Sequence, residues 1–197
     1  MVVAAFDFDG TITTKDTLFE FIKFSKGKFR LYTGVLLHSP LFLISVLGIF
    51  PKWQAKEIFF SYFFKNTNIK QFDEWGEKFV LVVEEMLNPH ALAAIKKHQQ
   101  NNDTLVVISA SVENWIKPWC QKQGINAVLA TQIEINPAGE LTGKFHSKNC
   151  YGKEKVCRLL QVFPGKENYT LVAYGDSKGD KELLAFADIA LYRKYVY

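Results

Sequence analysis

The chain contains little that could hold a small fold together covalently. It has three cysteines in 197 residues, Cys120, Cys150 and Cys157, with no CxxC motif and no histidine at metal-ligand spacing. Their odd number favours a reducing compartment, where we expect them to be small buried side chains. The formal net charge is only +4, too small to indicate a nucleic-acid-binding protein. A composition of 48% hydrophobic and 22% charged residues is that of a globular protein and excludes disorder or collagen.

The sequence also shows no internal repeat, no low-complexity linker and no recognisable signal peptide. The first eight residues carry no basic start, and Asp7 and Asp9 interrupt the only apolar run there. We therefore expect a cytoplasmic protein. One segment complicates this prediction, because the 21 residues between Arg30 and Lys52 carry no charge, about the ~20 needed to span a bilayer.

Short, continuously apolar segments alternate with amphipathic ones along most of the chain. The predicted buried strands are Val2–Phe8, Thr104–Ile108, Val128–Ala130, Tyr169–Tyr174 and Ile189–Leu191. The predicted helices between them are Pro89–Asn101, Val112–Gln123, Lys153–Phe163 and Gly179–Phe186. This alternation predicts an α/β fold, a doubly wound parallel sheet covered by helices on both faces.

Two segments do not fit the alternation and are interpreted as insertions. Residues 15–88 are aromatic-rich and helical, with no convincing strand, so we expect an inserted helical cap on a core made of residues 1–14 and 89–197. Thr131–Phe145 alternates apolar and polar residues around Pro137-Ala138-Gly139, which predicts a small β-hairpin.

Polar residues follow the predicted strands at the places where ligands bind a doubly wound sheet, beyond the carboxyl ends of the strands. The segments are DFDGT (7–11), ISAS (108–111), YGKEK (151–155) and GDSKGD (175–180). Several carboxylates that meet in one cleft repel one another unless a cation lies among them. A hard divalent cation with oxygen ligands, Mg²⁺, resolves the conflict. The candidate ligands are Asp7, Asp9, Asp176 and Asp180.

The first of these segments suggests phosphoryl transfer. Asp7 and Asp9, two residues apart on an extended strand end, share one face, so Asp7 can attack phosphorus while Asp9 serves as general acid and base. The Ser109 hydroxyl and a lysine, Lys155 or Lys153, can bind the phosphoryl oxygens. Further candidates for binding phosphate are Gly10, Thr11 and the backbone N–H of Ala110.

In the order and placement of these segments the sequence resembles the haloacid dehalogenase superfamily, specifically its phosphoserine-phosphatase-like branch. The resemblance implies a C1-type helical cap, with Asp7 as nucleophile, Asp9 as acid/base and Ser109 in the second motif. It also implies that Mg²⁺ is held by Asp7, the backbone carbonyl of Asp9 and Asp176. Similar members carry Gly-x-x-Lys-Val, which matches residues 152–156 and selects Lys155. An acid at position 9 favours a phosphatase over a dehalogenase.

Some features differ from phosphoserine phosphatases proper. The second motif is Ser109-Ala110-Ser111 rather than Ser-Gly-Gly-Phe, and the cap segment Trp53–Asn66 contains no arginine. Asp16 stands where those enzymes have a glutamate that binds the substrate amino group. The chain is similar to phosphatidylglycerophosphatase-type members, which implies a lipid or other small phosphate monoester as substrate. A phosphoserine-type metabolite phosphatase, a receiver-like signalling module and a binding protein with a decayed site are the alternatives.

The uncharged segment 31–51 cannot be a single membrane span, because Asp7 and Ser109 would then lie on opposite sides of the membrane. Pro40 near its middle predicts two short helical arms joined near His38-Ser39-Pro40. Either the arms pack together as the cap, or they dip into a membrane interface. The second interpretation rests on flanking basic residues suited to anionic headgroups: Lys23, Lys26, Lys28, Arg30, Lys52 and Lys56.

Three smaller expectations concern single residues. Ser111 is expected to cap the helix that follows the second motif. Trp115 and Trp119, four residues apart, are expected in the core. The histidines at 38, 90, 98 and 146 show no metal spacing and are expected at the surface or in the cap.

Overall fold

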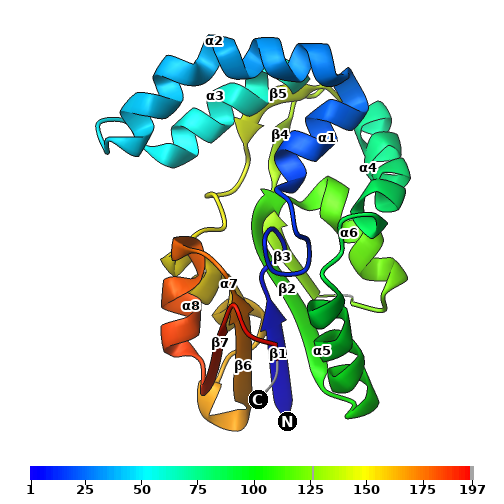
Figure 1. Ribbon diagram of the computed structural model, residues 1–197, viewed down its shortest axis with the longest axis vertical. Helices are drawn as coiled ribbons and strands as arrows, with labels where there is room; N and C mark the ends of the chain where they lie inside the picture. Colours follow the sequence, from blue (N-terminus) through cyan, green and yellow to red (C-terminus); the bar gives the residue numbers. More distant parts are fainter. Residues whose placement is uncertain (126, 196–197) are drawn as a thin grey trace.

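A five-stranded sheet forms the centre of the protein, in the computed structural model that describes residues 1–125 and 127–195. The strand order is β3-β2-β1-β6-β7, and every neighbouring pair is parallel. The strands are β1 (Val2–Phe6), β2 (Thr104–Val112), β3 (Ala127–Thr131), β6 (Thr170–Gly175) and β7 (Ile189–Tyr192). Figure 1 shows this sheet in the lower half of the molecule.

Helices cover both faces of this sheet, as predicted. Because side chains alternate along a strand, Ala4 and Phe6 of β1 lie in one core cluster and Val3 and Ala5 in a second. Side chains of α5 (Pro89–Gln100) and α6 (Glu113–Lys122) belong to the first cluster, and those of α7 (Lys153–Val162) and α8 (Lys181–Phe186) to the second. Two short 3-10 turns, Lys166–Asn168 and Lys178–Asp180, flank β6.

Four helices follow β1 and lie across the upper end of the molecule (Figure 1). They are α1 (Thr17–Lys26), α2 (Lys28–Val46), α3 (Lys52–Phe64) and α4 (Ile69–Glu84). Aromatic rings hold them to the core: the Phe21 ring stacks on Trp115 with centroids 4.8 Å apart and also contacts Phe79 edge-on at 5.1 Å. Trp115 and Trp119 are fully buried, as the sequence predicts.

The predicted hairpin is present as β4 (Ile133–Ile135) and β5 (Leu141–Phe145), which pair antiparallel. It rises from the core to the cap, where Asn66 and Thr67 exchange backbone hydrogen bonds of 2.8 and 2.9 Å with Leu141. Gly143 lies against α3 so closely that a Cβ there would be 2.3 Å from the Ser61 Oγ. The hairpin therefore attaches the cap to the core at a second point.

The prediction of two arms joined near Pro40 was wrong. Helix α2 continues through Pro40 to Val46, and the turn to α3 lies at residues 47–51. Proline cannot donate the hydrogen bond that the carbonyl of Leu36 would normally accept, but the Ser39 hydroxyl donates to that carbonyl at 2.8 Å. On its inner side α2 packs closely against α3, since a Cβ at Gly34 would lie 2.2 Å from the Phe63 ring.

Two further expectations need correction. His98 is fully buried, where its Nδ1 lies 2.7 Å from Asp103 and its Nε2 lies 2.9 Å from the Tyr174 hydroxyl. A histidine that satisfies buried polar partners gives no periodic signal in the sequence. Cys120 and Cys150 are buried, but Cys157 is exposed on α7.

Candidate active site

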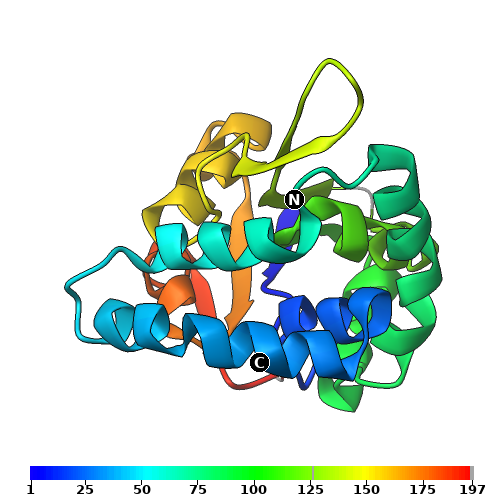
Figure 2. The ribbon, with the colours of Figure 1, turned by 90° about the horizontal axis from the view of Figure 1, so that it is seen from above.

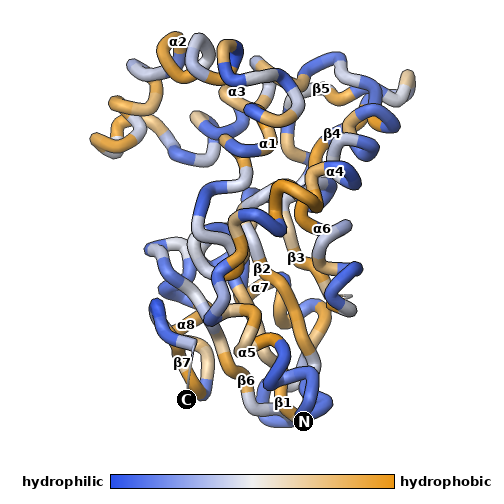
Figure 3. Tube along the Cα trace, turned by 45° about the vertical axis from the view of Figure 1, so that its right-hand side comes forward, coloured by the Kyte–Doolittle hydropathy of each residue, from blue (hydrophilic) through white to orange (hydrophobic). Residues whose placement is uncertain are grey.

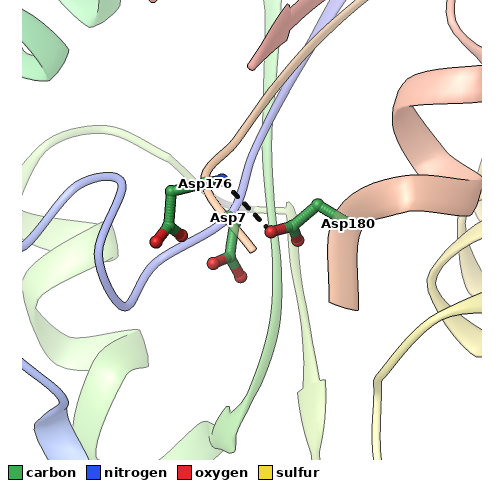
Figure 4. Close-up of side chains that lie close together, drawn as sticks. All are labelled: Asp7, Asp176 and Asp180. Atoms are coloured by element: carbon green, nitrogen blue, oxygen red, sulfur yellow. Dashed lines mark hydrogen bonds between the residues drawn. The ribbon is translucent and has the colours of Figure 1, made fainter. Parts of the chain in front are cut away.

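Three aspartates meet at the carboxyl ends of β1 and β6. Asp7 follows β1 directly, Asp176 follows β6, and Asp180 ends the short turn after β6. One carboxylate oxygen from each lies within 4.8 Å of the others. Figure 4 shows the Asp7 side chain between those of Asp176 and Asp180. The topology causes this, because β1 and β6 are adjacent parallel strands whose ends lie side by side.

A buried lysine lies against two of these carboxylates. The Lys155 Nζ donates to Asp7 Oδ1 and to Asp180 Oδ1, both at 2.5 Å, and its side chain is 2% exposed. Lys153, the alternative considered from sequence, is exposed. The difference follows from helix geometry, since residues two apart on α7 point in different directions.

The electrostatics of this cluster are unbalanced. Burial raises the pKa of Asp7 to about 7, an effect that Asp180 reinforces and that Lys155 only partly offsets. Burial and the charge of Asp180 also raise the pKa of Asp176. Burial alone would lower the pKa of Lys155, but Asp7 and Asp180 outweigh it and raise that pKa above its usual value. Lys155 is bonded to two of the three carboxylates, and Arg193 also acts on Asp176. Three ionised carboxylates would still exceed these two positive charges.

Asp180 has a structural part in the cluster. Its Oδ2 accepts hydrogen bonds from the backbone N–H of Asp176 at 3.2 Å, from the Ser177 N–H at 3.0 Å and from the Ser177 hydroxyl at 2.8 Å. With Lys155 on its other oxygen, Asp180 fixes the loop that carries Asp176 and holds Lys155 in place.

Asp9 lies at the entrance to the cap and is held by a chain of hydrogen bonds. Its Oδ1 accepts the backbone N–H of Thr17 at 2.7 Å, and its Oδ2 accepts the Ser111 hydroxyl. The Trp115 Nε1 donates to the Thr17 hydroxyl at 3.0 Å. Because Ser111 donates to Asp9 and Trp115 donates to Thr17, the Thr17 hydroxyl must donate to Ser111, 2.9 Å away.

This series of hydrogen bonds corrects one expectation and adds one residue that the sequence did not reveal. Ser111 is not a helix cap, because it lies within β2 and α6 begins at Glu113 after Val112. Its role is to hold Asp9. Thr17 was not predicted at all. The only available signal was its place at the start of α1, where its N–H is one of the unpaired donors of a helix N-terminus.

The second-motif residues lie at an irregularity in the sheet. The pairing of β2 with β3 shifts register between Ser109 and Val112, a bulge of the kind that redirects side chains at active sites. Ser109 is 1% exposed, and its Oγ accepts the Ser111 N–H at 3.0 Å. The Ala110 carbonyl accepts hydrogen bonds from the Lys56 Nζ and the Thr131 hydroxyl, both at 2.9 Å.

Gly10 and Thr11 form the loop beside Asp176. Gly10 has φ +80°, and a Cβ at this position would lie 2.4 Å from Asp176 Oδ2. Only glycine tolerates both the backbone conformation and the close approach. The Thr11 hydroxyl donates to Asp176 Oδ1 at 3.3 Å and thereby orients that carboxylate.

The cap contributes charged groups of its own to this region. The contact of Lys56 with the Ala110 carbonyl points Lys56 of α3 toward the second motif, so this residue does not belong to the set of outward basic charges expected from the sequence. Lys56 also interacts electrostatically with Asp16, which caps α1 by accepting the Leu18 N–H at 2.9 Å.

A cavity of about 540 Å³ lies between α3 and the segment that follows β5. Its lining residues are Trp53, Glu57, Phe145, His146, Ser147, Lys148, Asn149, Tyr151 and Glu154. It adjoins the site at two points. Asn149 and Ala110 both accept from the Thr131 hydroxyl, and the Tyr151 ring packs against Gly179 next to Asp180.

The order of strand ends, cap and acidic cluster along the chain is that of a known family. A family model for haloacid dehalogenase-like hydrolases matches residues 4–185. The chain belongs to this family. It is 32% identical over 193 residues to protein CicA of Caulobacter vibrioides, a match that covers 98% of this chain and 86% of that protein. It is also 32% identical to a histidinol-phosphatase of Neisseria meningitidis serogroup C, over 50% of this chain and 46% of that protein.

Solved structures share the fold. A protein of unknown function from Bordetella pertussis Tohama I superimposes with a TM-score of 0.83 at 20% identity and covers 96% of this chain and 88% of its own. A phosphoserine phosphatase, solved as an analogue of its phospho-aspartyl intermediate, gives a TM-score of 0.69 at 16% identity over 97% of this chain and 85% of its own. These structural matches show that the chain has the same fold as both proteins.

Proposed function

We propose that the protein is a Mg²⁺-dependent phosphatase that hydrolyses phosphate monoesters through a phosphoryl group carried on Asp7. The observation that carries this proposal is the cluster of Asp7, Asp176 and Asp180 around Lys155, with Asp9 held two residues from Asp7. The family membership and the histidinol-phosphatase relative support the same reaction class.

The acidic cluster fits a magnesium ion. Its donors are carboxylate oxygens, which Mg²⁺ prefers, and they are gathered within 4.8 Å. The pKa of Asp7, raised to about 7 by burial, supports the binding of a cation here, because the buried carboxylate is stabilised by an added positive charge. Asp7, Asp176 and the backbone carbonyl of Asp9 would hold the ion, with Asp180 bonded beside them. When bound, Mg²⁺ offsets the negative charge of the phosphoryl oxygens and of the aspartates.

The chemistry then follows from the residues themselves. An oxygen of Asp7 attacks phosphorus, the bond from phosphorus to the ester oxygen breaks, and Asp9 gives its proton to the leaving alkoxide. Asp9 next removes a proton from a water molecule, which attacks the aspartyl phosphate, releases inorganic phosphate and restores the Asp7 carboxylate. The Ser109 hydroxyl, the Ala110 N–H and Lys155 bind the phosphoryl oxygens as their charge increases.

We place the leaving group in the cavity beneath α3. Trp53 and Tyr151 supply apolar walls, and Glu57, Glu154 and Lys148 supply charge. On the side of the second motif, Lys56 offers a positive charge to an anionic substituent. This mixture suits a small polar metabolite or the headgroup of a lipid phosphate monoester.

The test is a phosphatase screen with Mg²⁺ and with EDTA, over phosphoserine, histidinol phosphate, sugar phosphates, nucleotides and short-chain lipid phosphates. We expect turnover that EDTA abolishes and that Asp7→Asn lacks. Mass spectrometry of intact Asp9→Asn after reaction with an aryl phosphate is expected to show a retained phosphoryl group. Equal turnover by the wild type and Asp7→Asn contradicts the proposal.

A further inference from the structure

Helix α2 is apolar on two opposite sides, but only one of them is covered. Leu31, Gly34 and Ser45 lie on the inner side and are buried against the rest of the cap. The opposite side carries Phe29, Tyr32, Leu36, Leu43 and Leu47, which are 80%, 67%, 75%, 61% and 65% exposed. Their spacing of three, four, seven and four residues places them on one stripe of the helix.

The exposed apolar surface continues beyond this stripe. Leu37 and Val46 on the flanks of α2 are 63% and 73% exposed, and Ile49 in the turn after α2 is 74% exposed, so the patch extends beyond the stripe. Figure 3 shows the apolar stretches of α2 at the outer end of the cap, and Figure 2 shows α2 alongside α3 on top of the molecule. We call the residues 29, 32, 36, 37, 43, 46, 47 and 49 the outer patch. An apolar patch of this kind marks an interaction surface.

The charge around the patch identifies its partner. From residue 21 to residue 56 the chain contains no aspartate or glutamate, but it contains five lysines and one arginine. Lys28 and Arg30 are exposed at one end of α2, and Lys52 is exposed just beyond the other. A second copy of this chain would bring these positive charges together. An apolar protein surface without acidic residues would offer them no counter-charge.

The geometry points to an anionic lipid surface as the occupant of the outer patch, with α2 lying in the plane of the interface. An apolar stripe flanked by basic residues is the arrangement of interfacial helices. A spanning role for α2 does not fit, although its 19 residues are long and apolar enough by composition. The residues before and after it, Thr17 and Lys56, both bond to the second motif of the core, so both ends of α2 return to the same side.

Docking in this orientation leaves the catalytic cluster free. The buried side of α2 faces α3, where Gly34 lies against the Phe63 ring, so the outer patch on the opposite side of the helix faces away from α3. Figure 2 shows α3 between α2 and the segment that follows β5, and the cavity lies between α3 and that segment. A docked enzyme would therefore have its cavity one helix away from the lipid surface. The inference does not depend on the proposed function, since binding can be measured without substrate.

The test is co-sedimentation of the full chain with vesicles of phosphatidylcholine alone or with added phosphatidylglycerol. We expect binding to the anionic vesicles that weakens as salt increases. Leu36→Asp with Leu43→Asp should reduce the affinity about tenfold or more for each residue, since each loses the burial of an apolar side chain. The matched control is Leu81→Asp on α4, 67% exposed outside the patch, which should bind as the wild type does.

A second pair of variants tests the charge. Lys28→Gln with Arg30→Gln should weaken binding about fivefold for each charge removed, whereas Lys70→Gln with Lys78→Gln on α4 should change it little. Absence of wild-type binding to anionic vesicles at low salt would overturn the inference. So would a lipid-free dimer, seen by analytical ultracentrifugation, that Leu36→Asp with Leu43→Asp converts to monomers, because a second copy would then cover the patch.

Discussion

Ser111 is the residue whose removal tests the arrangement around Asp9 most directly. Its hydroxyl donates to Asp9 Oδ2 and accepts from Thr17, so Ser111→Ala removes one of the two donors to this carboxylate. The backbone N–H of Ser111, which donates to Ser109, is retained. The substitution also removes the acceptor of the buried Thr17 hydroxyl, but among the groups assigned to catalysis only Asp9 is expected to change its orientation.

The magnitude follows from the type of hydrogen bond. A hydrogen bond to a charged group contributes about 1.5–3 kcal/mol, and each 1.36 kcal/mol in a barrier is a factor of ten. If Asp9 protonates the leaving group, kcat/KM for an alkyl phosphate should fall about 10- to 150-fold. With p-nitrophenyl phosphate the leaving group needs little protonation, and kcat/KM should fall less than about fivefold.

Steady-state kinetics on both substrates with saturating Mg²⁺ measure this difference. The parameter kcat/KM reports on the steps up to phosphoryl transfer, so hydrolysis of the phosphoenzyme does not mask the effect. Ser25→Ala, which removes a hydroxyl bonded to the Phe21 carbonyl at 2.7 Å in α1, is the control and should leave both values unchanged. Equal losses on the two substrates, or no loss on either, would refute the assignment of Ser111 as a positioning residue for Asp9.

Three further predictions concern the acidic cluster. Lys155→Met leaves Asp7 and Asp180 buried without their shared ammonium group, so in EDTA the free energy of unfolding should fall by about 3–5 kcal/mol, as measured by urea denaturation; an unchanged midpoint would contradict this. Gly10→Ala brings a Cβ within 2.4 Å of Asp176 Oδ2 at φ +80°, which should cost about 1–3 kcal/mol and weaken Mg²⁺ binding in calorimetry. In EDTA the free energy of unfolding should decrease as pH rises from 4 toward 7, because folded Asp7, with its pKa raised from 3.8 to about 7, keeps a proton that the unfolded chain has lost. Mg²⁺ competes with that proton, so the gain in melting temperature with Mg²⁺ should increase over the same pH range, and a gain independent of pH would argue against Asp7 as a ligand.

The sheet and its order of elements could be predicted because each buried strand is largely apolar and each helix that covers the sheet has one apolar face. The residues at which the strands and helices begin and end were harder to predict. The strand predicted as Val2–Phe8 ends at Phe6, although the Asp7 N–H still donates to the Tyr174 carbonyl of β6 at 2.9 Å. The continuation of α2 through Pro40 depends on the hydroxyl of Ser39, a local compensation that a general rule about proline does not include.

The motif residues of the site could be predicted, but the residues that hold them could not. Asp7, Asp176 and Lys155 were identified by their place after strands and in a motif, and the structure brings them together. Thr17 and Ser111 have no such signal. They are a threonine and a serine 94 residues apart in sequence, and only the packing of α1 against the end of β2 makes them neighbours.

The same contacts explain why a cap inserted at this point of the chain can affect catalysis. The backbone N–H of Thr17, the first residue of α1, donates to Asp9, so the start of the cap is bonded directly to the proposed acid/base group. Lys56 of α3 makes the corresponding contact with the second motif at Ala110. Movement of α1 away from the core would break the first of these hydrogen bonds, and movement of α3 would break the second. The hydrogen bonds that orient Asp9 therefore depend on the position of α1 against the core, and under the proposed mechanism so does proton transfer by Asp9.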